Sequence, residues 1–233
     1  MAKHLDLEEQ EQLDELKHFW KNYGNLITWV LIAVFGAVAA WNGFQYWQRS
    51  QAIQAAAMFD EVERSAAAAD IPRLERSLAD MQSKFGGTTY AQQGALLAAK
   101  SFFEKGKPDA AKDALIWVTQ KSSDDGYVAV AKLRLASLLL QQKAYDEALK
   151  SLAGTFPPDF AALFADRKGD VLSLQGKKLE AIAEYEKAYK LFDAQSEYRR
   201  LVEVKLSALG VDPGGPKVDP STLAGNPDAG GKK

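Results

Sequence analysis

A segment near the C-terminal end of the chain, GDVLSLQGKKLEA (residues 169–181), has two counterparts earlier in the sequence. They read AKSFFEKGKPDAA (99–111) and ASLLLQQKAYDEA (136–148), and the successive copies lie 37 and then 33 residues apart. Each copy opens and closes on a small residue. A period of this length is typical of stacked helical hairpins. The sequence therefore predicts an all-α fold that contains an α-solenoid.

The small residues have a physical role in such a hairpin, because two antiparallel helices approach closely only where small side chains meet. The residues that open the three copies are Ala99, Ala136 and Gly169. Gly106 and Gly176 fall between the two helices of their copies, where a glycine ends a helix at low cost. The period resembles that of tetratricopeptide repeats, about 34 residues. The alternative is a set of alanine-rich helices that align by coincidence, but the agreement of three copies at two small positions favours the repeat.

The rest of the soluble part divides by composition. Residues 50–69, 72–85 and 196–209 are rich in strong helix formers and predict further helices, of which the last caps the solenoid. Long runs of alternating β-branched residues are missing, so no sheet is expected. We place a tetratricopeptide-like repeat domain at residues 48–210. The Pro- and Gly-rich residues 211–233 are predicted to form a disordered tail.

An uncharged apolar segment precedes the repeats. Residues 22–48 contain no Asp, Glu, Lys or Arg, and about 20 apolar residues suffice for a helix to span the hydrocarbon core. The apolar residues of this segment sum to about -3 to -5 kcal/mol on the insertion scale, with no central charge to oppose them. We predict a single N-terminal transmembrane helix at residues 25–47, anchored at the two interfaces by Trp29, Trp41 and Trp47.

The apolar segment has two alternative interpretations, a buried core helix and a cleaved signal peptide. A buried core helix would need no aromatic residues at both ends, and the small residues at 37–39 resemble the cleavage site of a signal peptide. The long acidic arm ahead of the segment argues against a signal peptide. Lys17 and Lys21 lie close to the N-terminal end of the segment, whereas Arg49 stands alone after it, and this bias favours a cytoplasmic N-terminus. Residues 1–24 are then a cytoplasmic amphipathic arm.

The composition argues against catalysis. The chain has no cysteine, and its two histidines, His4 and His18, both precede the apolar segment, so the repeat domain lacks the commonest general base and metal ligands. The formal net charge of -2 gives no reason to expect nucleic acid. A hydrolase using Asp166 and Asp170 remains an alternative, because the two carboxylates share one helix face. We interpret that face as solvated, and we expect no enzyme activity, metal, cofactor or small-molecule substrate.

In tetratricopeptide solenoids the first helix of each pair lines a concave groove. Carried over by position, that groove is predicted to contain Leu96, Lys100, Phe103, Leu133, Ser137, Leu140, Asp166, Asp170 and Ser173. Its apolar members would contact extended or partly folded protein chains. The alternative is that these apolar residues pack against the neighbouring helix.

Four segments outside or between the repeats carry a resemblance to a known family. They are EEQEQLDELKHFWKNYGN (8–25), WNGFQYWQRSQ (41–51), TYA (89–91) and VKL (204–206). Together they resemble the YfgM-like ancillary subunits of the bacterial Sec translocon, and the acidic arm is the most distinctive of the four.

The resemblance implies a non-enzymatic inner-membrane protein with one span and with its repeat domain in the periplasm. Such a protein is expected to associate with the SecYEG translocon and with a membrane-anchored periplasmic chaperone, and to help pass translocated proteins to periplasmic chaperones. The alternative is a repeat scaffold of the same topology that serves another inner-membrane or cell-envelope assembly complex.

Overall fold

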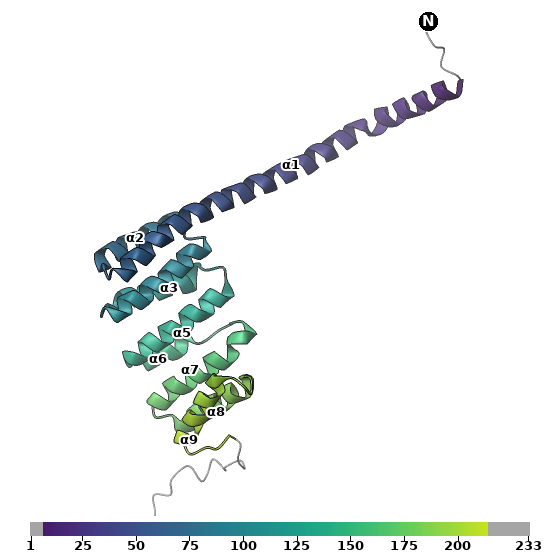
Figure 1. Ribbon diagram of the computed structural model, residues 1–233. Helices are drawn as coiled ribbons and strands as arrows, with labels where there is room; N and C mark the ends of the chain where they lie inside the picture. Colours follow the sequence, from purple (N-terminus) through teal and green to yellow (C-terminus); the bar gives the residue numbers. More distant parts are fainter. Residues whose placement is uncertain (1–6, 214–233) are drawn as a thin grey trace, which may run out of the picture. The chain divides into compact units, whose positions relative to one another are not determined.

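The computed structural model describes residues 7–213, and every regular element within them is helical. The elements are α1 (Leu7–Ala67), α2 (Ile71–Phe85), α3 (Thr89–Glu104), α4 (Pro108–Lys121), α5 (Asp125–Gln141), α6 (Tyr145–Ser151), the 3-10 turn η1 (Pro158–Phe160), α7 (Ala161–Leu174), α8 (Lys178–Leu191) and α9 (Glu197–Ala208). Figure 1 labels these elements except α4 and η1. This part of the chain confirms the predicted all-α fold and the three additional helices. The predicted disordered tail lies, from residue 214 onward, outside the described residues.

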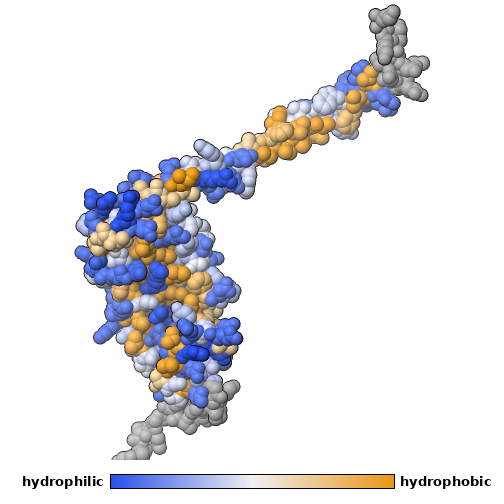
Figure 2. Space-filling model, viewed as in Figure 1, coloured by the Kyte–Doolittle hydropathy of each residue, from blue (hydrophilic) through white to orange (hydrophobic). Residues whose placement is uncertain are grey.

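The first compact unit of the chain ends at Gln54 and consists, in its described part, of the N-terminal portion of α1. This helix holds the one candidate membrane span found in residues 7–213, with a mean hydropathy of 1.8. Figure 2 shows its apolar side chains as a band along the helix. Thr28 Oγ1 donates to Gly24 O at 2.8 Å and Asn42 Nδ2 donates to Val38 O at 2.9 Å. Each of these polar side chains therefore donates a hydrogen bond to its own helix, which lowers the cost of placing it in hydrocarbon.

The second unit begins at Ala55 and contains the three predicted hairpins, α3–α4, α5–α6 and α7–α8. Their turns are alike, because Gly106, Lys143 and Gly176 all have a positive φ, between +60° and +77°. In each turn the following N–H bonds back to a carbonyl five residues earlier, at 2.8–2.9 Å, for example from Lys107 N to Phe102 O. This is the Schellman arrangement, which satisfies carbonyls at the end of the first helix.

A further hairpin of the same kind precedes the three, and the sequence pattern did not reveal it. The C-terminal part of α1 pairs with α2 through a turn at Ala69, whose φ is +54°. Asp70 N bonds to Ser65 O at 3.0 Å, as in the other turns, and Ala69 lies 37 residues before Gly106. The two positions where the other hairpins have small residues hold Val62 and Leu74, both fully buried. Because these side chains are bulky, the small-residue pattern is lost here although the turn is kept.

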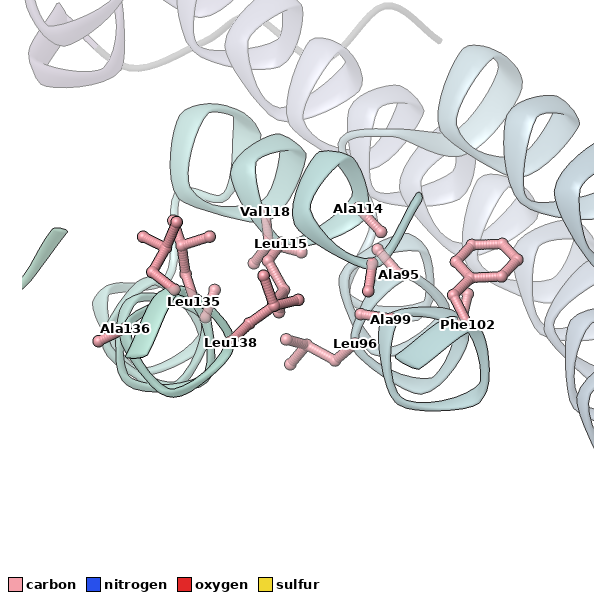
Figure 3. Close-up of a cluster of buried hydrophobic side chains, with 14 of the residues drawn as sticks. Ala95, Leu96, Ala99, Phe102, Ala114, Leu115, Val118, Leu135, Ala136 and Leu138 are labelled. Atoms are coloured by element: carbon pink, nitrogen blue, oxygen red, sulfur yellow. The ribbon is translucent and has the colours of Figure 1, made fainter. Parts of the chain in front are cut away.

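The hairpins share a core that runs without a break through most of the second unit. One cluster of buried side chains extends from Val62 to Val171. Figure 3 shows Leu96 pointing from α3 toward Leu138 of α5, while the ring of Phe102 lies on the other side of α3. The two sides of α3 therefore pack against different helices. The two concave surfaces described below lie on these two sides.

The last hairpin has a smaller core of its own, which α9 completes. Ile182 of α8 packs with Val202 and Leu206 of α9 in a second buried cluster. Gly169 of α7 lies directly against the ring of Tyr185 of α8, the close approach that small residues at this position permit. The helix α9 thus closes the C-terminal end of the solenoid, as predicted for a capping helix.

Candidate protein-binding groove

A concavity of about 430 Å³ lies between α3 and α5, on the side of α3 that carries Leu96. It is lined by Ala99, Lys100, Phe103, Leu115, Arg134, Ser137, Leu138 and Gln141. Three of the predicted groove residues, Lys100, Phe103 and Ser137, come together in it. Phe103 is 39% exposed although it is aromatic. The groove therefore offers an uncovered ring beside polar and charged side chains.

The other apolar residues expected in the groove lie elsewhere in the packing. Leu96 is only 7% exposed and belongs to the main core, and Leu133 and Leu140 are half-buried against that core. For these three leucines the structure agrees with the alternative that they pack against neighbouring helices. The Ser137 hydroxyl donates to Leu133 O at 2.8 Å, so its proton is already used within α5.

The third hairpin does not continue this concavity. Ser173 is half-buried in α7, and Asp166 and Asp170 bind the terminal helix instead. Lys205 Nζ of α9 lies 2.7 Å from an Oδ1 atom of each aspartate. The interpretation of this helix face as solvated is therefore wrong, because the two carboxylate side chains are only 15% and 16% exposed. A partner lysine far along the sequence covers them.

Two further contacts hold this ionic cluster together. Tyr185 donates its hydroxyl to Asp170 Oδ1 at 2.8 Å, and Arg167 lies 3.1 Å from Asp170 Oδ2. Burial raises the pKa of the Asp166 carboxyl, an effect that the hydrogen bond from Lys205 partly opposes. Burial, reinforced by the nearby Asp170 carboxylate, also raises the pKa of Tyr185. The cluster is a structural clasp between α7, α8 and α9.

Arg134 and Gln141 line the groove but were not expected there. Together with Ser137 they lie three and four residues apart along α5, so helical periodicity alone could have identified them. Arg134 Nη1 donates to Leu96 O at 3.1 Å, which fixes the guanidinium at the groove. Lys100 Nζ lies 3.8 Å from Oε1 of the exposed Glu104, and an exposed ion pair of this kind contributes little to stability.

The groove combines an exposed aromatic ring with two cations, and such a surface can contact a segment of another protein. An apolar side chain of that segment would contact Phe103, and its backbone or acidic groups would meet the guanidinium of Arg134 and the ammonium of Lys100. Within residues 7–213 no three His, Asp or Glu side chains converge closely enough to hold a metal ion.

Comparisons with known proteins identify the family. The model of the tetratricopeptide repeat-like domain family matches residues 17–211. A relative from Neisseria gonorrhoeae named "Ancillary SecYEG translocon subunit" is 34% identical over 213 residues, which cover 90% of this chain and 100% of the relative. Relatives of the same name from Haemophilus influenzae and Escherichia coli are 28% and 26% identical, over 78% and 87% of this chain and 89% and 97% of their own lengths. The chain therefore has a tetratricopeptide repeat-like domain and belongs to the YfgM-like family of ancillary SecYEG translocon subunits.

Proposed function

We propose that this protein is a non-enzymatic, membrane-anchored adaptor that associates with the Sec translocon and helps pass translocated proteins to periplasmic chaperones. The observation that carries this proposal is the 34% identity that covers the whole Neisseria gonorrhoeae relative, whose name assigns it to the SecYEG translocon. The helical repeats and the groove between α3 and α5 support an adaptor, because stacked repeats present extended binding surfaces.

The proposed topology follows from the apolar stretch of α1. Residues 25–47 cross the inner membrane once, residues 1–24 lie in the cytoplasm, and the repeat domain lies in the periplasm. Trp29, Trp41 and Trp47 are strongly exposed on α1, as aromatic anchors at the two membrane interfaces would be. A reporter fused after Lys233 tests this topology, because an alkaline phosphatase fusion is active only in the periplasm and a green fluorescent protein fusion exported through Sec is dark.

Anchoring near the translocon gives the adaptor its effect. A tether converts capture of an emerging chain into a local event with a high effective concentration, so weak groove contacts suffice. The groove is proposed to receive an unfolded segment of the translocated protein, or of a membrane-anchored periplasmic chaperone that takes the protein over. Lys100, Phe103 and Ser137 are the predicted residues that remain at its surface.

Site-specific photo-crosslinking of the full chain in inner-membrane vesicles tests the proposal. A photoreactive residue replaces Phe103 in the groove or, as the matched control, the exposed Lys187 on α8. A secretory protein is arrested in the translocon, and adducts to it and to SecY are identified. Adducts to the arrested chain from position 103 but not from position 187 are expected. If neither SecY nor the arrested chain is captured, and the protein does not copurify with SecY in mild detergent, the proposal is wrong.

A further inference from the structure

A second concave surface lies on the side of α3 that faces away from the groove. This cleft has a volume of about 350 Å³ and is formed by α2 and α4 with Phe102 of α3 as its floor. The α2 wall consists of Glu75, Leu78, Ala79 and Gln82, and the α4 wall of Ala110, Asp113, Ala114 and Trp117. Each wall is one helical stripe with the same i, i+3, i+4, i+7 spacing. The cleft is therefore flanked by two helix faces over about two turns, or about 10 Å.

The bottom of the cleft is apolar and firmly packed. Phe102, Leu78 and Ala114 are 2%, 6% and 3% exposed. Trp117 is half-buried at one end, where a Cβ on Gly86 would come within 3.3 Å of its ring. The Trp117 ring therefore packs against the α2–α3 turn and closes this end of the cleft.

The mouth of the cleft is acidic. Glu75 and Asp113 stand one on each wall, and both side chains are exposed. Within residues 7–213 neither carboxylate takes part in an ion pair or hydrogen bond. The groove on the other side of α3 instead carries the cations Lys100 and Arg134. The charged residues that line the two concavities beside α3 therefore have opposite signs.

We propose that this cleft docks a cationic amphipathic helix of a partner protein. An apolar stripe at i, i+3, i+4 and i+7 would lie over Phe102 and beside Trp117, as in helix-in-groove recognition. Lysine or arginine residues flanking that stripe would meet Glu75 on one side and Asp113 on the other. An acidic segment or an anionic lipid surface would be repelled by the same two carboxylates. This binding face is additional to the groove of the proposed function.

Two synthetic peptides of equal length test the cleft. Both carry leucines at i, i+3, i+4 and i+7, and the flanking positions are all lysine in one peptide and all glutamate in the other. Fluorescence anisotropy measures their binding to the full chain in nanodiscs of neutral phosphatidylcholine, with empty nanodiscs subtracted. The lysine peptide is expected to bind at least tenfold more tightly than the glutamate peptide.

Three variants locate the binding. The double variant Glu75→Gln, Asp113→Asn is expected to weaken the lysine peptide by about two- to tenfold, since it removes two exposed ion pairs. Ala79→Trp fills the cleft and is expected to weaken it at least tenfold. Ala183→Trp changes another exposed alanine, on α8; it is the matched control and is expected to leave binding unchanged.

Several outcomes would overturn the proposal. Equal binding of the two peptides would mean that the carboxylates select nothing, and full binding by Ala79→Trp would place the peptide elsewhere. Absence of binding by both peptides, with self-association of the chain that Ala79→Trp abolishes, would show that a second copy covers the cleft instead. Since none of these variants touches the groove between α3 and α5, failure here leaves the crosslinking result at position 103 unaffected.

Discussion

Replacing Gly169 by alanine should destabilise the last hairpin, because the new methyl group has no room. A Cβ at this position would lie 2.6 Å from both Cδ1 and Cε1 of Tyr185. Carbon atoms in ordinary contact are about 3.5–4.0 Å apart, so either the ring or the helix must move by about 1 Å. The tyrosine ring is only 4% exposed, and its hydroxyl is held by Asp170 at 2.8 Å.

The size of the effect follows from three opposing contributions. Overpacking a buried site costs about 1–3 kcal/mol, and a weakened hydrogen bond to Asp170 adds about 0.5–1.5 kcal/mol. Alanine offsets about 1 kcal/mol of this through its better helix propensity. The expected net loss for Gly169→Ala is therefore about 0.5–3.5 kcal/mol of unfolding free energy, with a central value of about 2 kcal/mol. For a domain of this size the central value corresponds to a fall in Tm of about 4–8 °C.

Thermal unfolding of the full chain in detergent, followed by circular dichroism, measures this loss. Gly87→Ala serves as the control, because a Cβ there meets nothing within 4 Å, and a change within about 0.5 kcal/mol is expected. Introducing Gly169→Ala into a Tyr185→Leu background should cost at least about 1 kcal/mol less than in the wild type, since the two positions are in contact. An unchanged Tm, or the same cost in both backgrounds, would refute the steric argument.

Three further predictions concern the turns, the ionic cluster and the span. Lys143→Gly should stabilise the protein by about 0.5–1 kcal/mol in urea unfolding, because a φ of +60° strains a residue that has a side chain. The control Gln142→Gly changes a residue with a φ of -78° and should destabilise the protein. If Lys143→Gly does not stabilise the protein, the assignment of this turn is wrong. Burial raises the pKa of Asp166. The contribution of this carboxyl to the free energy of unfolding is therefore largest below about pH 4 and is lost as the pH rises through the raised pKa. The stability of the wild type relative to Asp166→Asn, measured by urea unfolding from pH 4 upward, should therefore fall, and a difference that rises with pH would show the opposite shift. Val34→Asp adds a charge that costs about 2.5–3.5 kcal/mol of insertion free energy to a segment whose insertion is favourable by about 3–5 kcal/mol. The fraction of the protein that stays in the membrane after carbonate extraction should therefore decrease. An unchanged fraction would show that residues 25–47 are not the span.

The turns explain why the sequence revealed three hairpins and missed the first one. Gly106 and Gly176 indicate turns with a left-handed residue, because glycine adopts a positive φ without strain. Ala69 adopts the same conformation without a glycine, and Val62 and Leu74 replace the small pair. Packing and backbone hydrogen bonds keep the turn at Ala69 in the same conformation as the other turns. These interactions cannot be recognised from the residue types alone.

For the candidate site, the sequence predicts on which face of a helix a residue lies, but not whether another helix covers it. Periodicity placed Phe103 and Ser137 on the groove side, and the concavity contains both. It could not distinguish Leu96, which the neighbouring hairpin buries, from a residue left at the surface. Nor could it anticipate that Lys205 covers Asp166 from a distance of 39 residues, because such a contact depends on how the terminal helix packs.

The recurring turn has a consequence for how the chain can change length. At Gly210 the φ is again positive, and Val211 N bonds to Leu206 O at 3.0 Å, as it does between Lys107 and Phe102. Because these turns are alike, a unit that runs from the end of one turn to the end of the next begins and ends with the same backbone geometry. Residues 107–143 form one such unit, which contains α4 and α5. Duplicating them in place would lengthen the array by one period, while the apolar part of α1 at one end and the ionic cluster at the other keep their own neighbours. The length of the solenoid can therefore change by whole repeats without any change in the sequence at either end of the domain.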